Sequence, residues 1–198
     1  MTQTLHNTAH LALQTIVSFL IDDGIGDNKT LFNLIMTCQR FAQKRHLFIK
    51  GCEFNNKKSE WLYKNKPQYW NQVHSFNLWG CKNITDVSAL GKVHILILNG
   101  CSKITDVSAL GKVNRLFLWG CRNITDVSAL GQVHTLDLSH CDNITDVSPL
   151  GHVHELDLSF CQNITDVSAL GQVHTLDLKY CRNITDYSAL KNVKKLIR

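Results

Sequence analysis

The sequence lacks the features that would place the chain in a membrane or outside the cell. None of its apolar runs approaches the ~20 residues of a membrane-spanning helix, and its N-terminus has no basic segment followed by an apolar one, as a signal peptide would have. A strong charge of one sign is also missing, since a formal net charge of +5 over 198 residues is mild. We therefore predict a protein that is not secreted, with a cytoplasmic or nuclear location and with no membrane or nucleic-acid partner.

Motifs for catalysis are missing as well. The sequence has no Gly-rich phosphate loop, no nucleophile elbow and no metalloprotease helix. Its Ser, His and Asp residues recur at a fixed spacing, which would place them in rows and not around one reacting centre. We predict that the chain is not an enzyme and uses no cofactor.

The dominant feature that is present is a unit of 20 residues, which occurs six times in succession from Val73 to Asn192. Counted from the first valine of each unit, positions 1, 4, 6, 9, 12, 15 and 18 are apolar. A fixed period of this length indicates a solenoid, in which each unit is too small to bury a core alone and stacks on its neighbours. A hydrophobic content of 44% fits a chain that buries a real core.

Each unit divides into a strand and a return. Positions 3 to 7, as in Thr135–Ser139, alternate outward polar with inward apolar residues, which is the period of a strand, and stacked copies would form a parallel sheet. The run Leu-x-Leu-x-x-Cys-x-x-Ile resembles cysteine-containing leucine-rich repeats, and Ile-Thr-Asp-Val-Ser-Ala-Leu resembles the returns of internalin-type repeats. This resemblance implies an α/β fold, a leucine-rich-repeat solenoid with a parallel concave β-sheet and short 3₁₀ or loop returns. The Asp at position 14, or the Ser at position 16, can cap one 3₁₀-like turn in each return.

Cysteine and histidine each recur at one position. Six of the eight cysteines occupy position 9, and in a reducing compartment we expect them to be buried thiols and not disulfides. A row of zinc sites is the alternative, but a zinc site needs four converging ligands. For the histidines we expect a solvated row at the edge of the sheet, with metal binding or joint protonation as the alternative. They lie at position 2, in a row interrupted by Asn114: His74, His94, His134, His154 and His174.

Residues 8–46 do not repeat and are predicted to form three short helices, because apolar residues there follow helical spacing. The segment Thr37-Cys38-Gln39-Arg40-Phe41 follows a leucine-rich helix, and together with Ile16–Leu20 it resembles an F-box. That resemblance implies binding to a Skp1-type subunit of a cullin ubiquitin ligase. The side chains implied in this contact are Ile16, Leu20, Leu31, Leu34, Ile35 and Phe41.

A second interpretation of these helices is a cap over the open end of the solenoid, because a bare terminal repeat exposes apolar surface and an unpaired strand edge. The segment also departs from an F-box, since it lacks the usual opening Leu-Pro and the chain has only two prolines, Pro67 and Pro149. The two interpretations are compatible with each other.

The solenoid is predicted to begin before Val73. Leu47, Ile49 and Cys52 match positions 4, 6 and 9 of a degenerate unit. The predicted organisation is an F-box-like helical segment at 1–46, a degenerate first repeat with an N-terminal cap at 47–72, and leucine-rich repeats at 73–198, with six full units and a partial seventh strand.

A partner protein is expected on the concave face of the sheet, where positions 3, 5, 7 and 8 point outward. The first three units carry an apolar cluster there that the stack itself does not require, and exposed clusters with Trp are typical of interaction sites. The later units carry an acidic row with His140, Phe160 and Tyr180 alongside. An acidic row beside aromatic residues would suit a basic peptide, or the row serves solubility alone. The apolar residues are Trp79, Ile95, Ile97, Phe117 and Trp119, and the acidic ones are Asp137, Glu155, Asp157 and Asp177.

Two functional hypotheses follow from these features. In the first, the chain is a protein-interaction adaptor, an F-box-type substrate receptor that links a Skp1-cullin ubiquitin ligase to an unknown protein substrate on the concave face. In the second, it is a binding scaffold or decoy with a helical cap and no link to a ligase. Only residues 8–46 separate the two hypotheses.

Overall fold

The computed structural model describes residues 46–48 and 75–198. In this part of the chain, eight strands form one parallel sheet in the order β1 to β8, and six short 3₁₀ turns alternate with strands β2 to β8. The elements are β1 (His46–Phe48), β2 (Ser75–Asn77), η1 (Ser88–Leu90), β3 (Ile95–Ile97), η2 (Ser108–Leu110), β4 (Arg115–Phe117), η3 (Ser128–Leu130), β5 (Thr135–Asp137), η4 (Ser148–Leu150), β6 (Glu155–Asp157), η5 (Ser168–Gln172), β7 (Thr175–Asp177), η6 (Ser188–Asn192) and β8 (Lys195–Ile197).

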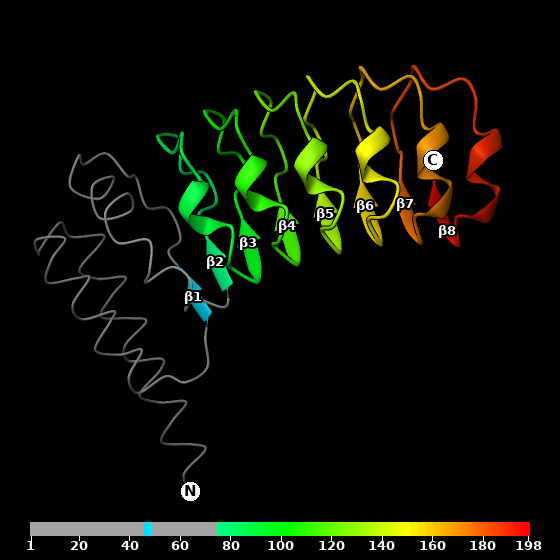
Figure 1. The fold of residues 1–198 in the computed structure, drawn as a ribbon. Coiled ribbons are helices and arrows are strands. Elements are labelled where there is room, and N and C mark those ends of the chain that lie inside the picture. The colour runs from blue at the N-terminus through cyan, green and yellow to red at the C-terminus, as the bar shows by residue number, and fades with distance from the viewer. Residues whose placement is uncertain (1–45, 49–74) are drawn as a thin grey trace, which may run out of the picture.

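Equal positions of neighbouring units lie side by side in the sheet. Leu116 of β4, for example, pairs with Leu136 of β5, and every pair from β2 to β8 keeps this register of one unit. Figure 1 shows the strands in sequence order along one side of the solenoid. The predicted leucine-rich-repeat solenoid with a parallel sheet and 3₁₀ returns is confirmed.

The strands are shorter than predicted, but their pairing continues beyond them. Each covers positions 3 to 5 of the unit and not 3 to 7. Past the end of β3, the Leu98 amide still donates to the Phe117 carbonyl at 2.8 Å, and the Gly100 amide donates to the Trp119 carbonyl at 2.7 Å. The ladder of interstrand hydrogen bonds therefore reaches position 8, where the chain turns away from the sheet.

The core consists of columns of identical residues. The apolar positions 1, 4, 6, 9, 12, 15 and 18 are buried in nearly every described unit, and Ile84, Tyr187 and Val193 are partly buried at the two ends. In the middle of the stack, Leu116 and Leu130 are 0% exposed. Because adjacent strands lie only ~4.8 Å apart, each side chain packs against its own copies in the units before and after it.

The aspartate at position 14 orders each return. In the third unit, the Asp126 carboxylate accepts a hydrogen bond from the backbone amide of Ser128 at 2.8 Å, and the other five units repeat this contact. Ser128 is the first residue of η3, and Val127 before it makes no side-chain cap. Of the two residues predicted to cap the turn, the aspartate therefore makes the hydrogen bond, in an Asx turn that leads into the 3₁₀ turn and not from its N-cap position.

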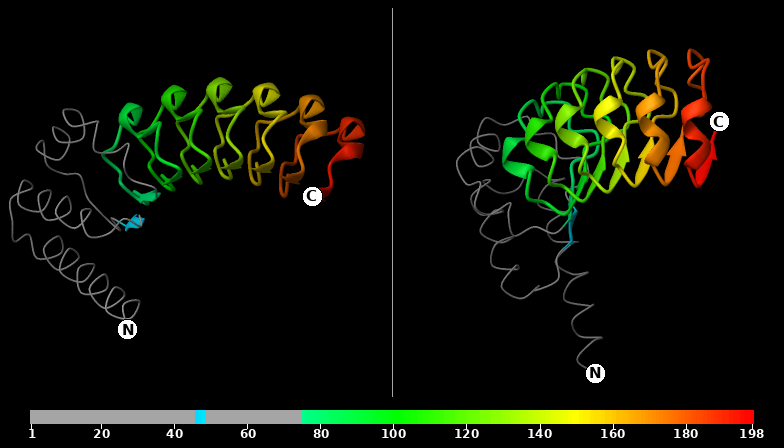
Figure 2. Two further views of the ribbon diagram at one scale, coloured as in Figure 1. Left: turned by 60° about the horizontal axis from the view of Figure 1, so that its bottom comes forward. Right: turned by 45° about the vertical axis from the view of Figure 1, so that its right-hand side comes forward.

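The sheet lines the inner side of an arch, and the 3₁₀ turns lie on its outer side (Figure 2). The turns approach one another closely at position 19, where five units have glycine. A Cβ on Gly151 would lie 2.5 Å from the carbonyl oxygen of Ala169 in the next turn. Within the described residues, no helix is long and apolar enough to cross a membrane.

Candidate functional site

The first three units expose large apolar side chains on the inner face of the sheet. Trp79 is 51% exposed and Trp119 is 42% exposed, although both are hydrophobic. Beside them, Ile95 and Ile97 of β3 and Phe117 of β4 are only partly buried. These five residues are the predicted apolar cluster, and we call them the apolar patch. The structure brings them together on neighbouring strands, as their shared positions in the unit require.

The patch is not covered by other described parts of the chain. The Trp79 indole lies next to Gly100, and a Cβ added to this glycine would be in ordinary van der Waals contact with the ring, 3.9 Å from its Cδ1. The guanidinium of the exposed Arg115 lies 5.6 Å from the centre of the Phe117 ring, within the range of a cation–π contact. The described part of the chain thus leaves a large apolar area facing outward.

The later units place three aspartates in register on the same face. Asp137 pairs with Asp157 and Asp157 with Asp177, at position 5 of β5, β6 and β7. We call these three residues the acidic row. All three side chains are partly buried, and the exposed Glu155 accepts a 3.3 Å hydrogen bond from the Thr135 hydroxyl.

The acidic row also has a structural role that the sequence analysis missed. The carboxylates of Asp137 and Asp157 accept hydrogen bonds from the backbone amides of Ser139 at 2.9 Å and Ser159 at 2.8 Å. Asn77 does the same for the amide of Trp79 at 3.0 Å. The signal was present in the sequence, because position 5 is Asn or Asp in four units, and these residues are typical of an Asx turn.

Within the acidic row, the pKa of the Asp137 carboxyl is raised. Burial is the main cause that raises the pKa of the Asp137 carboxyl, while its hydrogen bonds from Ser139 lower the pKa. The neighbouring carboxylate of Asp157 raises the pKa further, and His140 lowers it. A positive charge placed over the row would stabilise the ionised form of Asp137.

Position 8 has a left-handed backbone in every full unit. The first three units have Gly80, Gly100 and Gly120 there, with φ of 74°, 71° and 70°. The next three have His140, Phe160 and Tyr180, with φ of 58°, 64° and 61°. A non-glycine residue in this conformation costs roughly 1–2 kcal/mol, so the later units replace the favourable residue with large rings.

These rings form a continuous stack along the solenoid. His140 and Phe160 stack with ring centres 4.2 Å apart, and Phe160 and Tyr180 stack at 4.4 Å. Trp119 contacts His140 edge to face at 5.7 Å and so joins the stack to the apolar patch. We call His140, Phe160 and Tyr180 the ring stack. The sequence analysis placed these three residues beside the acidic row, but it predicted neither their stacking nor their left-handed backbone.

The histidines at position 2 form a second row of stacked rings. His134 and His154 are 4.6 Å apart between ring centres, and His154 and His174 are 4.5 Å apart. The Nδ1 atom of His134 lies 3.3 Å from the Thr135 hydroxyl, and His174 has the same contact with Thr175. Among the residues that the structure describes, no cluster of three or more His, Cys, Asp or Glu side chains is arranged to hold a metal ion.

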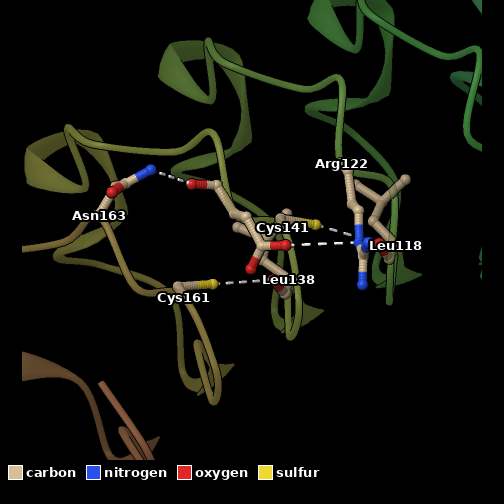
Figure 3. A network of polar contacts seen from close by, with 7 residues as sticks. Leu118, Arg122, Leu138, Cys141, Cys161 and Asn163 are labelled. Carbon is tan, nitrogen blue, oxygen red and sulfur yellow. Dashed lines mark hydrogen bonds and ion pairs between the residues drawn. The ribbon is translucent and has the colours of Figure 1, made fainter. Parts of the chain in front are cut away.

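The cysteines at position 9 are buried free thiols, as predicted. The Cys141 thiol donates to the Leu118 carbonyl of the preceding unit at 3.2 Å, and Cys161 donates to Leu138 at the same distance (Figure 3). Burial raises the pKa of Cys121 to about 12. A thiol with this pKa is neutral at pH 7, so it is neither a good nucleophile nor a ready metal ligand.

A second row of side chains links the units next to the cysteines. The Asn163 amide donates to the Asp142 backbone carbonyl at 2.7 Å, and Asn123 and Asn183 make the corresponding bonds in their units (Figure 3). An exposed ion pair joins Arg122 and Asp142 at 3.4 Å. These contacts are structural, and an exposed pair of this kind contributes little stability.

The predicted sites thus divide into two groups. The concave-face residues are together on one surface, with the apolar patch and the acidic row side by side in sequence order. The predicted Skp1-contact residues Ile16, Leu20, Leu31, Leu34, Ile35 and Phe41 lie outside the described residues.

Comparison with known proteins supports the repeat fold. A family model described as Leucine Rich repeat matches residues 133–148 and 152–170. No curated protein matches the chain in sequence. Repeat solenoids of this kind present extended concave surfaces that serve in binding, which suggests an interaction scaffold.

Solved structures of internalins from Listeria monocytogenes are similar to the chain. For the internalin InlF, the identity is 26% and the TM-score 0.52, over 65% of this chain and 41% of that one. Internalin C2 has 19% identity and a TM-score of 0.42, over 66% of this chain and 82% of that one. The functional domain of InlJ, described as including a cysteine ladder, has 21% identity and a TM-score of 0.37, over 63% and 39%. This chain therefore spans about two fifths of the InlF chain that it matches.

Proposed function

We propose that the chain is a protein-binding adaptor whose repeats hold a partner protein on the inner face of the sheet. One observation carries the proposal: Trp79 and Trp119 are 51% and 42% exposed on that face. Trp is enriched among the residues that contribute most to protein–protein affinity. The core columns are complete without these two side chains, so the stability of the stack does not explain them.

The partner can be identified by cross-linking from the face itself. A photoreactive amino acid in place of Phe117, two residues before Trp119 in the third unit, should cross-link a protein partner in cells that express the chain. The same amino acid at Thr125, on an exposed return, is the matched control. Cross-links of equal yield and identity from both positions would contradict binding on the inner face.

The affinity of the identified partner then tests the apolar patch. The double change Trp79→Ala and Trp119→Ala should weaken binding by about tenfold or more and leave the melting temperature nearly unchanged. Lys112→Ala, at an exposed residue beside the 3₁₀ turns, should change neither. A large drop in the melting temperature of the double variant would show that the rings stabilise the fold instead.

The second part of the proposal is that residues 8–46 connect the repeats to a Skp1-type subunit of a cullin ubiquitin ligase. It is supported by the sequence Thr37-Cys38-Gln39-Arg40-Phe41 and by the leucine-rich segment before it. On this proposal the chain is an F-box-type substrate receptor in the cytoplasm or nucleus. The alternative is a scaffold or decoy in which the same helices only cap the solenoid.

A pull-down with a purified Skp1-type protein separates these two roles. The intact chain should bind, and Leu34→Asp or Phe41→Asp should abolish binding. Circular dichroism must show that each variant keeps the repeats folded. No binding by the intact chain, under conditions in which another F-box protein binds, would leave only the scaffold role.

A further inference from the structure

The inner face of the sheet changes its chemistry between the third and fourth units. Positions 5, 7 and 8 are Phe117, Trp119 and Gly120 in the third unit. In the fourth unit the corresponding residues are an aspartate, a serine and a histidine. From this point to β7 the face carries the acidic row, and the ring stack runs beside it. The two rows are close enough for the charge of His140 to lower the pKa of Asp137.

Stability alone does not account for the ring stack. Three non-glycine residues adopt the strained left-handed conformation there. The two stacked pairs, His140–Phe160 and Phe160–Tyr180, offset only part of that strain through ring contact. Glycine serves the same backbone position in the first three units, and Tyr180 is 55% exposed. The rings therefore contribute more to an exposed aromatic surface than to the stability of the fold.

Carboxylates beside exposed aromatic rings favour one kind of ligand group. A guanidinium pairs with carboxylates through its planar N–H groups and also stacks on aromatic rings, whereas an ammonium lacks the planar stacking surface. Nucleic acid is disfavoured here, because its phosphates would be repelled by the acidic row. The row is also a local exception, since the chain as a whole has a formal net charge of +5.

We propose that the acidic row and the ring stack bind an arginine-containing segment of the partner protein, with arginine side chains between Asp137, Asp157 and Asp177 and the rings of Phe160 and Tyr180. This inference rests on the proposed function and names the chemistry of the partner. The apolar patch then contacts an apolar part of the same partner, because Trp119 joins the patch to the stack.

The structure supplies variants that change the charge without changing the turn. The carboxylate of Asp157 accepts the Ser159 amide at 2.8 Å, and the side-chain oxygen of Asn77 accepts the Trp79 amide at the same position of its unit. Asp→Asn changes in the acidic row should therefore keep the Asx turns. Phe160→Gly is equally conservative for the backbone, because the first three units have glycine at this position.

The test uses the full chain and a fluorescent peptide in which arginine alternates with serine. The peptide should bind the wild-type chain, and the triple variant Asp137→Asn, Asp157→Asn, Asp177→Asn should lower its affinity by about tenfold or more. The triple variant Asp106→Asn, Asp126→Asn, Asp146→Asn makes the same change of net charge on the returns and should have little effect. Citrulline in place of arginine should abolish binding. Lysine should bind more weakly than arginine, and Phe160→Gly should remove this difference.

Each of the opposite results would contradict a different part of the inference. Equal losses in both triple variants would mean that only net charge matters, and equal binding of lysine and arginine would remove the role of the rings. If the peptide does not bind but the cross-linked partner still requires Trp79 and Trp119, the arginine chemistry is wrong while the proposed function stands. If neither the peptide nor a partner binds to this face, both proposals fail.

Discussion

The glycine at position 19 offers a sharp test of how the units are held together. Gly151 has a φ of −59°, which alanine adopts without strain, so the change Gly151→Ala acts only through its added methyl group. That methyl carbon would lie 2.5 Å from the Ala169 carbonyl oxygen. Carbon–oxygen contacts normally begin at about 3.3 Å, and the oxygen belongs to the backbone of the next turn, so the turns must move apart.

We expect the change to destabilise the fold by about 2–3 kcal/mol, near the upper end for overpacking. The matched control is Gly120→Ala, at a glycine with a φ of 70° and no neighbouring atom within 4 Å of the added carbon. In Gly120→Ala the only cost is the strain of alanine in a left-handed backbone. Alanine also makes the unfolded chain less flexible, which partly offsets this strain, so we expect a net destabilisation of about 1 kcal/mol. In the sixth unit, the residue at position 19 is Lys191 and not glycine. No further 3₁₀ turn follows this unit in the described residues, so a side chain at this position meets no next turn there.

Urea denaturation followed by circular dichroism measures both differences, and equal m-values would show that the transitions can be compared. In thermal scans, a loss of this size corresponds to roughly 2–4 °C per kcal/mol for a chain of this length. An effect of Gly151→Ala no larger than that of Gly120→Ala would refute the argument. It would mean that the outer turns yield easily and that the sheet and core alone set the spacing of the units.

Three further predictions concern the rows of identical residues. Leu116→Ala, in a fully buried column, should cost about 2–5 kcal/mol in urea denaturation. Burial raises the pKa of the Cys121 thiol from an ordinary 9.0 to about 12. As the pH rises above 9, the thiol therefore loses its proton in the unfolded chain but keeps it in the folded one. The free energy of unfolding should fall as the pH rises from 9 toward 12. Cys121→Ala should reduce that slope, and native repeat thiols should not react with thiol reagents at pH 8. Hydrogen bonds from Ser128 lower the pKa of the Asp126 carboxyl, so their contribution should be lost as the pH falls below about 4 in acid titrations of stability. Asp126→Asn should reduce this dependence only by its own share, because the other units repeat the contact.

The sequence predicts the solenoid well because its information is repeated. A column of leucines at position 4 requires that all units stack in one register, and the observed pairing of Leu116 with Leu136 is that register. The same logic predicts the buried cysteines and the aspartates that order the returns. A residue at a buried position of the unit packs against its own copies in the neighbouring units. Its residue type and its burial can therefore be predicted from the period of the sequence alone.

The inner face was predicted less completely, for two physical reasons. The row of Asp137, Asp157 and Asp177 was predicted from charge, but its hydrogen bonds to the backbone depend on a turn that begins where the strand ends. The left-handed backbone at position 8 is signalled by Gly80, Gly100 and Gly120, yet rings in the later units hide that signal. The F-box-like motif occurs only once and has no second copy to test it, so it stays a prediction.

The chemistry of the inner face changes at the boundary between the third and fourth units. On one side lie Phe117 and Trp119, and on the other lie Asp137 and His140, while the buried positions do not change across the boundary. Trp119 and His140 touch edge to face at 5.7 Å, so the two surfaces share an edge. Because the core is the same on both sides, exchanging whole units across this boundary should keep the fold and change only the partner. The double change Ile95→Thr and Ile97→Asp gives the second unit the residues of the fourth at positions 3 and 5 and keeps Gly100. This chain should therefore melt like the wild type and lose binding that depends on the order of the two surfaces.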